Sequence, residues 1–219
     1  MMHPDQGSGP QYFSEKKPGA IRLWHWLTFL FFSVSVTTVV FASTIFRTRN
    51  NIEMVKEQVA QKGGSLTRDQ AFSVAHEYSD KLWGLHKWLG YGLSILLLWR
   101  VVIEMMLSKS DRLGTRIRKA LSFPDLGGEK KHHLWVHYGY AVFYVLFFTM
   151  AITGLVLAFE DVSWLDPVHK AANSIHSVVQ YGLYAYVILH LAGVIRADLT
   201  RYGGIVSRMI NGRTKEHRS

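Results

Sequence analysis

The stretch IHSVVQYGLYAYVILH, residues Ile175 to His190, decides the fold class of this chain. It lies in a run of 25 residues, Ala171 to Ile195, that contains no Asp, Glu, Lys or Arg. An α-helix of that length crosses a bilayer. Its two histidines, His176 and His190, are 14 residues apart, which is about 3.9 turns and about 21 Å along the axis. Both imidazoles therefore point nearly the same way, and one face of one membrane helix carries a nitrogen ligand at two depths.

The composition places the chain among integral membrane proteins. Of its 219 residues, 48% are hydrophobic, and four apolar runs reach membrane length, which is rare in a soluble protein of this size. We predict an all-α fold, an integral membrane up-and-down four-helix bundle. The predicted spans are about 23–46, 83–107, 134–159 and 173–196. Together they form a membrane domain, 21–200, between a disordered N-terminal tail, 1–20, and a basic tail, 201–219.

The residue types present limit the chemistry. The chain has no cysteine, which excludes disulfides, iron–sulfur clusters, thiolate ligation of haem and covalent haem attachment. Histidine, with 11 copies, is the available ligand type. The net charge of +9 does not indicate nucleic-acid binding, because the basic residues cluster between the apolar runs, as membrane topology requires.

The longest connection, 47–82, carries weak signals of local structure. Ile52, Val55 and Val59 have helical spacing, Gly63–Gly64 interrupts it, and Thr67 is placed to cap a second helix that ends near Asp80. Connections of this length are usually functional or carry structure of their own. A solvated cap without a role is the alternative, and the sequence favours neither.

The distribution of Lys and Arg predicts the orientation. One side of the membrane receives the two tails and the middle loop, with 16 Lys or Arg, and the other side receives 7. The positive-inside rule therefore places both termini in the cytoplasm of a bacterial inner membrane. The four helices then run alternately outward and inward.

This topology gives each histidine in a span a depth. His25 and His190 lie near the cytoplasmic face, and His86 and His176 lie near the external face. Bis-histidine ligation of haem needs two imidazoles on opposite sides of a flat macrocycle, and two helices that face each other across a bundle can supply them. Two such levels predict two haems and a path for electrons across the membrane.

Other interpretations of these histidines compete with haem ligation. A single membrane histidine often only hydrogen-bonds a neighbouring helix, but four histidines at two matching levels favour paired ligands. A transition-metal transporter is a third alternative, since imidazoles bind zinc, copper and nickel. Metal paths usually also need carboxylates or thiols, and the helix interiors offer only Glu104.

Further candidate cofactor contacts lie on the second and third spans. Gly90 shares the face of His86 and would let a broad ring approach the backbone. Arg100, deep in the second span, needs an anionic partner, which is either a haem propionate or Glu104 one turn away. His137 has no histidine left to pair with. It either lines a quinone pocket or lies at the membrane interface.

Four sequence segments together resemble the prokaryotic four-helix cytochrome b561 family. They are RLWHW from Arg22, LHKWLGYG from Leu85 with the downstream Arg100, HYGYAVFYVLFFTMAITGL from His137, and the histidines 14 residues apart in the last span. The resemblance covers about residues 20–200. It implies a cofactor-binding set of His25 with His190 and His86 with His176 as axial ligands of two haems b, which is the pairing that the topology predicts.

The resemblance also implies electron transfer between a periplasmic partner and the quinone pool. The family includes the cytochrome b subunits of nickel–iron hydrogenases and formate dehydrogenases, and some stand-alone members resemble superoxide oxidases that reduce quinone. The external loop, 47–82, is longer than expected of compact stand-alone members and favours a subunit that docks a partner. A superoxide:quinone oxidoreductase is the alternative. The direction of electron flow, the quinone type and the oligomeric state stay open.

Overall fold

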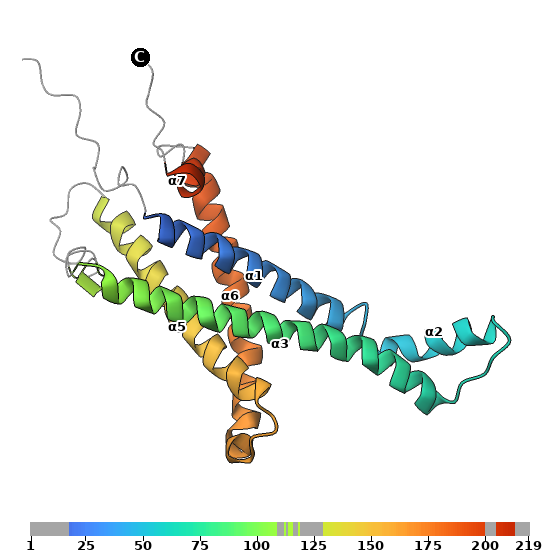
Figure 1. The fold of residues 1–219 in the computed structure, drawn as a ribbon. Helices are drawn as coiled ribbons and strands as arrows, with labels where there is room; N and C mark the ends of the chain where they lie inside the picture. The colour runs from blue at the N-terminus through green and yellow to red at the C-terminus, as the bar shows by residue number, and fades with distance from the viewer. Residues whose placement is uncertain are drawn as a thin grey trace, which may run out of the picture. The chain divides into compact units, whose positions relative to one another are not determined.

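The computed structural model describes residues 18–108, 112, 114–115, 118, 129–199 and 205–212. Every element within these ranges is a helix, and none of these residues is in a strand. The elements in chain order, shown in Figure 1, are α1 (Gly19–Ser43), α2 (Thr48–Ala60), α3 (Arg68–Met106), α5 (Glu129–Ala158), the 3₁₀ turn η2 (Ser163–Leu165), α6 (Asp166–Leu199) and α7 (Ile205–Asn211). The predicted disordered tail lies outside the described residues up to position 17.

Four segments are long and apolar enough to cross a membrane, which confirms the predicted all-α membrane class. They are α1, α3, α5 from Tyr138, and η2 with α6. In the most apolar part of each, only 6% to 22% of the residues are buried. Large apolar side chains such as Trp88, which is 73% exposed, form the outer surface instead. Such a surface is unfavourable in water but matches lipid.

The main difference from the predicted boundaries is the length of α3. The helix predicted after Thr67 and the second span are one continuous helix of 39 residues. No Gly or Pro separates Asp80 from Trp83, so the backbone continues where only the side-chain polarity changes. The predicted cap is confirmed: the Gln70 amide donates to Thr67 Oγ1 at 3.2 Å, and the Thr67 amide donates to Gln70 Oε1 at 2.9 Å. This reciprocal pair is a capping box.

The connection before α3 contains a helix, α2, which ends at the predicted break. Gly63 adopts a positive φ of 82°, a conformation that favours glycine. The Gly64 amide donates to the Val59 carbonyl at 3.0 Å, which satisfies a carbonyl of the last turn. The connection 47–82 is therefore largely a helical extension built from α2 and the start of α3.

The described residues group into two compact units. Of these residues, the first unit contains those up to Trp26, those within Val102–Leu146 and those from Val178 onward, and the second contains Leu27–Val101 and Phe147–Ser177. Each of the four long helices contributes residues to both units. His25 and His190 belong to the first unit, whereas His86 and His176 belong to the second.

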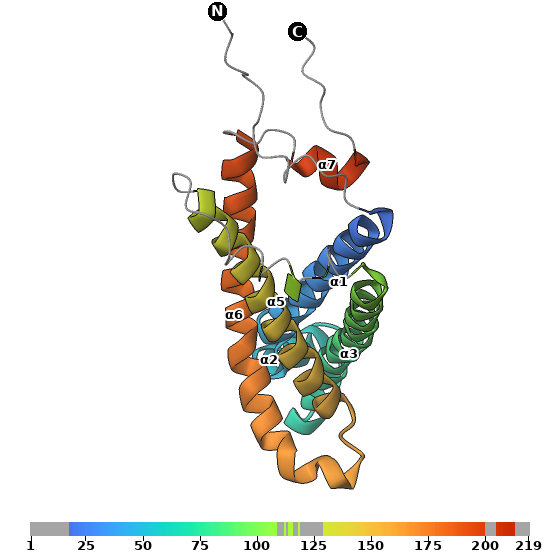
Figure 2. The ribbon, with the colours of Figure 1, turned by 90° about the vertical axis from the view of Figure 1, so that its left-hand side faces the viewer.

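In the first unit, α7 lies beside the start of α1, as Figure 2 shows. Trp26 Nε1 donates to the carbonyl of Met209 at 3.1 Å, and Arg22 Nη1 donates to the carbonyl of Ile210 at 3.0 Å. Both carbonyls are in the last turn of α7, where no intrahelical partner exists. Part of the predicted basic tail, 201–219, is therefore a short helix attached to α1.

The second unit contains close helix contacts around small residues and polar side chains. A Cβ at Gly92 would lie 2.3 Å from Cε1 of Phe31, so glycine allows α3 to approach α1. On the other helices, His169 Nε2 lies 2.9 Å from the carbonyl of Val156 in the last turn of α5. His169 thus joins α6 to a carbonyl that lacks a helical partner.

Candidate functional site

The structure brings the four predicted histidines together as two pairs, each within one unit. In the second unit, the ring centroids of His86 on α3 and His176 on α6 are 6.4 Å apart, and the rings are inclined by 89°. In the first unit, the centroids of His25 on α1 and His190 on α6 are also 6.4 Å apart, with an angle of 58°. These are the pairs that the topology predicts. Their role as ligands stays a prediction.

The spacing within each pair fits two imidazoles on one metal ion. With metal–nitrogen bonds of about 2.0–2.1 Å and a ring radius of about 1.1 Å, two rings on opposite sides of one ion have centroids about 6.4 Å apart. No group of three or more His, Cys, Asp or Glu side chains suited to a metal occurs among the residues described. A pair of ligands fits a metal whose other positions are filled by a macrocycle, as in haem.

The tautomer of His176 follows from the hydrogen bonds of Thr153. Thr153 Oγ1 donates its single proton to the backbone, with the carbonyl of Thr149 at 2.7 Å. The same oxygen lies 3.0 Å from His176 Nδ1, so it must accept a proton from that nitrogen. Nδ1 of His176 therefore carries the hydrogen, and the lone pair of Nε2 remains available for a metal.

The same proton accounting applies to His86. Thr38 Oγ1 donates to the carbonyl of Ser35 at 2.7 Å, and it lies 3.4 Å from His86 Nδ1. Ser35 Oγ lies 3.1 Å from the same nitrogen. Because the Thr38 proton is already used, the Thr38 oxygen can only accept from His86 Nδ1, whereas the Ser35 hydroxyl can accept from that nitrogen or donate to it. With the hydrogen on Nδ1, His86 leaves Nε2 for coordination, as His176 does.

Two glycines leave room around the His86–His176 pair. A Cβ at Gly154, on α5, would lie 3.2 Å from Cε1 of His176, so glycine lets the imidazole pack against this helix. A Cβ at Gly90, one turn after His86, would meet no heavy atom within 4 Å. The open space at Gly90 agrees with the predicted approach of a broad ring. The residues of this pair therefore fit a haem.

Aromatic rings contact both members of the His25–His190 pair. The Trp26 ring meets His25 edge-on at 5.3 Å, and the Tyr186 ring lies parallel to His190 within 5° at 6.1 Å. Phe143 in turn contacts Tyr186 at 5.2 Å. Nδ1 of His25 is buried and has no hydrogen-bond partner within the described ranges. The pair has the spacing of metal ligands in an apolar, aromatic setting.

The two other candidate contacts are less defined. Arg100 is a half-buried residue of α3, and Glu104 follows one turn later. The predicted partner of Arg100, either a haem propionate or Glu104, stays a prediction. His137 lies on α5, but its side chain is outside the part of the chain that the structure describes. Its assignment to a quinone pocket stays a prediction.

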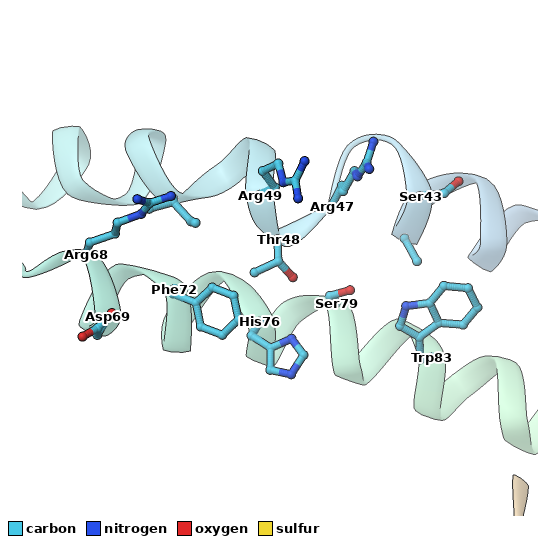
Figure 3. Close-up of a pocket in the computed structure, with 12 residues that line it drawn as sticks. Ser43, Arg47, Thr48, Arg49, Arg68, Asp69, Phe72, His76, Ser79 and Trp83 are labelled. Carbon is cyan, nitrogen blue, oxygen red and sulfur yellow. The ribbon is translucent and has the colours of Figure 1, made fainter. Parts of the chain in front are cut away.

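An open pocket of about 640 Å³ lies between α2 and the start of α3, next to the end of α1 (Figure 3). Three exposed arginines line it: Arg47, Arg49 and Arg68. Within the described residues, none of the three side chains forms an ion pair or a hydrogen bond. Trp83 also lines this arginine pocket, and its ring meets His86 edge-on at 5.7 Å. The pocket therefore reaches the His86–His176 pair through one side chain.

Sequence reasoning missed the hydroxyl groups beside His86 and His176. Ser35, Thr38 and Thr153 are each at most 7% exposed within otherwise apolar helices. Polar side chains in membrane helices generally face the protein interior, so the sequence does mark them as inward-facing. The sequence gives no signal for which imidazole each hydroxyl contacts.

A family model described as prokaryotic cytochrome b561 matches residues 18–212. The chain therefore belongs to this family, and the predicted resemblance is confirmed. No curated protein and no solved structure matches the chain. Family membership and the four apolar helices make the chain a membrane-spanning haem b electron-transfer protein.

Proposed function

We propose that this member of the cytochrome b561 family holds two haems b and links a periplasmic redox partner to the quinone pool. His86 and His176 would bind one haem iron, and His25 and His190 would bind the other. Haem iron held by two imidazoles supplies one-electron chemistry without a change of protein ligand. The chain's own residues fix the positions of both sites and the surfaces through which electrons enter and leave.

The observation that carries this proposal is the equal spacing of the two pairs. Both have centroids 6.4 Å apart, and the hydroxyl contacts of His86 and His176 are compatible with the tautomer that offers Nε2. Nδ1 of each of these two histidines contacts a hydroxyl on a neighbouring helix. Nε2 of each then remains available for a metal.

The assignment of levels rests on what each unit contains. The described ends of the chain lie in the first unit with His25 and His190, and the helical extension lies in the second with His86 and His176. The excess of Lys and Arg near the termini supports a cytoplasmic position for that end. The His86–His176 pair would then be the level nearer the periplasm.

The arginine pocket is our candidate for the docking site of an acidic periplasmic partner. Exposed cations without partners attract an anionic surface and accelerate its encounter. Trp83 lines the pocket and contacts His86, so a docked partner would lie close to that level. Superoxide is also an anion, and an isolated chain that reduces quinone with superoxide would favour the stand-alone oxidoreductase instead.

Quinone is the proposed partner at the other level, where protons would come from the cytoplasm. His137 and Arg100 remain the candidate quinone or propionate contacts. Aromatic side chains around His25 and His190, such as Tyr186 and Phe143, provide an apolar setting of the kind that ligand pockets use.

The direct test is an optical spectrum of the purified protein. A reduced-minus-oxidised spectrum should show haem b bands, and the purified protein should contain two haems per chain. Absence of haem b bands would contradict the proposal. One haem per chain would contradict the proposal of two haem sites and would leave the family assignment intact.

A further inference from the structure

We propose that the hydroxyls of Ser35, Thr38 and Thr153 lower the midpoint potential of the haem at His86–His176 below that of the haem at His25–His190. The downhill direction for one electron is then from the His86–His176 level, which is oxidised, to the His25–His190 level, which is reduced. This inference rests on the proposed function, because it requires a haem on each pair.

The first step is the hydrogen bond that His176 donates. Thr153 Oγ1 gives its proton to the Thr149 carbonyl at 2.7 Å and contacts Met150's carbonyl at 3.2 Å. Its 3.0 Å contact with His176 Nδ1 is therefore an N–H donated by the imidazole. The hydroxyl acts as a fixed acceptor, since Thr153 is only 7% exposed and its proton is committed to the backbone.

The second step is the matching arrangement at His86. Two hydroxyl oxygens, of Ser35 at 3.1 Å and of Thr38 at 3.4 Å, lie around His86 Nδ1. Thr38 is 4% exposed, and its proton goes to the Ser35 carbonyl. We assign the hydrogen of His86 to Nδ1, so that both imidazoles of this level donate the N–H of Nδ1 to a buried hydroxyl oxygen.

The other level lacks this arrangement. Nδ1 of His25 is buried without a hydrogen-bond partner, and the imidazole of His190 makes no hydrogen bond to any residue within the described part of the chain. Both imidazoles instead contact aromatic rings, Trp26 beside His25 and Tyr186 beside His190. The two pairs have the same distance between ring centroids, but only His86 and His176 have hydroxyl oxygens next to Nδ1.

This difference has a chemical consequence. An acceptor on the outer N–H of a ligating imidazole fixes the ring and raises the basicity of the nitrogen that binds the metal. A more basic ligand stabilises the more highly charged ferric iron, and hydrogen bonding around the ligands is one of the means by which a protein sets a haem potential. The level with three hydroxyls should therefore have the lower potential.

The experiment is a potentiometric titration of the haem-loaded protein, monitored by absorbance. The single-haem variants His190→Ala and His86→Ala assign each midpoint potential to its level. Thr153→Val, which has nearly the same shape without the hydroxyl, should raise the lower potential and leave the higher one unchanged. Thr153→Ser, which keeps the hydroxyl, should stay close to the wild type.

A matched control is available one position from a tested residue. Thr37 also donates to a backbone carbonyl, that of Ser33, at 2.9 Å, but among the described residues it forms no hydrogen bond with a histidine. Thr37→Val should leave both potentials unchanged, whereas Thr38→Val should raise the lower one. If Thr153→Val fails to fold, the double variant Ser35→Ala, Thr38→Val gives the same test on the other ligand.

The possible failures are distinguishable. A wild-type protein that binds no haem would contradict the proposed function itself. Two bound haems whose potentials do not respond to loss of the hydroxyls would overturn this inference alone. A higher potential at the His86–His176 level in the single-haem variants would also overturn it, because the direction would then be reversed.

Discussion

The two histidine pairs have the same spacing but different surroundings. Each has ring centroids 6.4 Å apart, yet buried hydroxyls contact His86 and His176, while aromatic rings contact His25 and His190. Spacing determines whether a pair can hold a metal, whereas the surroundings determine the properties of the metal that it holds. Two haems with the same pair of ligands would therefore differ in potential through their surroundings.

The two levels also differ in what lies nearest to them along the chain. The His86–His176 pair is connected through Trp83 to the arginine pocket. The His25–His190 pair shares its unit with α7, which attaches to α1 through Arg22 and Trp26. The His86–His176 pair thus lies near exposed arginines, and the unit of the His25–His190 pair contains a short helix whose last carbonyls accept hydrogen bonds from side chains of α1.

The largest expected effect comes from removing one ligand of either pair. His176→Ala should abolish haem binding at the His86–His176 level and leave the other haem in place, because each iron needs both imidazoles. His190→Ala should do the reverse. Haem content per chain and the optical spectrum measure both results.

The control for these variants is His76→Ala. His76 is an exposed residue of the arginine pocket and pairs with Asp80 on its own helix at 3.3 Å, so its loss should leave both haems in place. If His176→Ala and His190→Ala removed the same haem, the division into two levels would be wrong.

A packing change in the second unit should affect one level more than the other. Gly92→Ala would place a Cβ 2.3 Å from the ring of Phe31, and overpacking of this kind typically costs about 1–3 kcal/mol. The Phe31 ring would have to move, which would disturb the contact between α1 and α3. We expect a lower melting temperature in detergent and a changed spectrum at the His86–His176 level.

Gly84→Ala is the matched control on the same helix, because its Cβ would meet no heavy atom within 4 Å. It should preserve or slightly raise the melting temperature, because alanine favours a helix over glycine by about 0.5–1 kcal/mol, and it should leave both spectra unchanged. An equal decrease with the two substitutions would show that contact with Phe31 does not determine the outcome.

Charge reversal in the arginine pocket should alter the entry of electrons at one level only. Arg49→Glu should slow the reduction of the His86–His176 haem by dithionite, an anion, several-fold at low salt, because electrostatic steering raises encounter rates by about 10- to 1,000-fold in favourable cases. Reduced methyl viologen, a cation, should react no more slowly. Stopped-flow absorbance at two salt concentrations measures both rates.

Lys56→Glu provides a control for this rate effect. Lys56 lies on α2 outside the pocket and forms an ion pair with Glu53 at 3.5 Å. An equal decrease with Lys56→Glu would mean that the net charge of α2 matters and that the pocket has no specific role.

The sequence predicts the fold class and the histidine pairing because both depend on regularities along the chain. A charge-free run of 25 residues requires a membrane helix, and alternating helix direction then assigns a level to each histidine. The helical register of His176 and His190 requires no tertiary information. The cap at Thr67 and the break at Gly63 are local signals of the same kind.

The sequence could not predict where α3 begins or which hydroxyl meets which imidazole. The polar start of α3 continues directly into its apolar part, so the helix has no break at the point where its side chains change from polar to apolar. Thr153 and His176 are 23 positions apart on different helices, and their contact depends on how α5 and α6 pack. The arginine pocket likewise arises only when α2 folds beside α3.

The smallest expected effect concerns an ion pair next to His86. Lys87, on α3, pairs with Glu160, which follows α5. The hydrogen bond and charge of Lys87 lower the pKa of the Glu160 carboxyl below its ordinary value of 4.5. A carboxyl with a lowered pKa stabilises the fold above its unfolded pKa, and this contribution is lost as the pH falls through the folded pKa.

Both side chains are exposed, at 41% and 64%, so solvent screening limits the contribution to about 0–1 kcal/mol. Glu160→Gln should therefore lower the melting temperature slightly at pH 7, and the difference from the wild type should decrease as the pH falls below 4.5 and disappear once it has passed through the lowered pKa of Glu160. Glu57→Gln, on α2, removes an exposed carboxylate without an ion pair in the described structure and should change little at either pH.

A difference for Glu160→Gln that persists in acid would show that the amide disturbs the link after α5 for reasons other than charge. The comparison between the two levels also predicts that the spectrum at His25–His190 is the same in both variants, because Lys87 and Glu160 belong to the second unit.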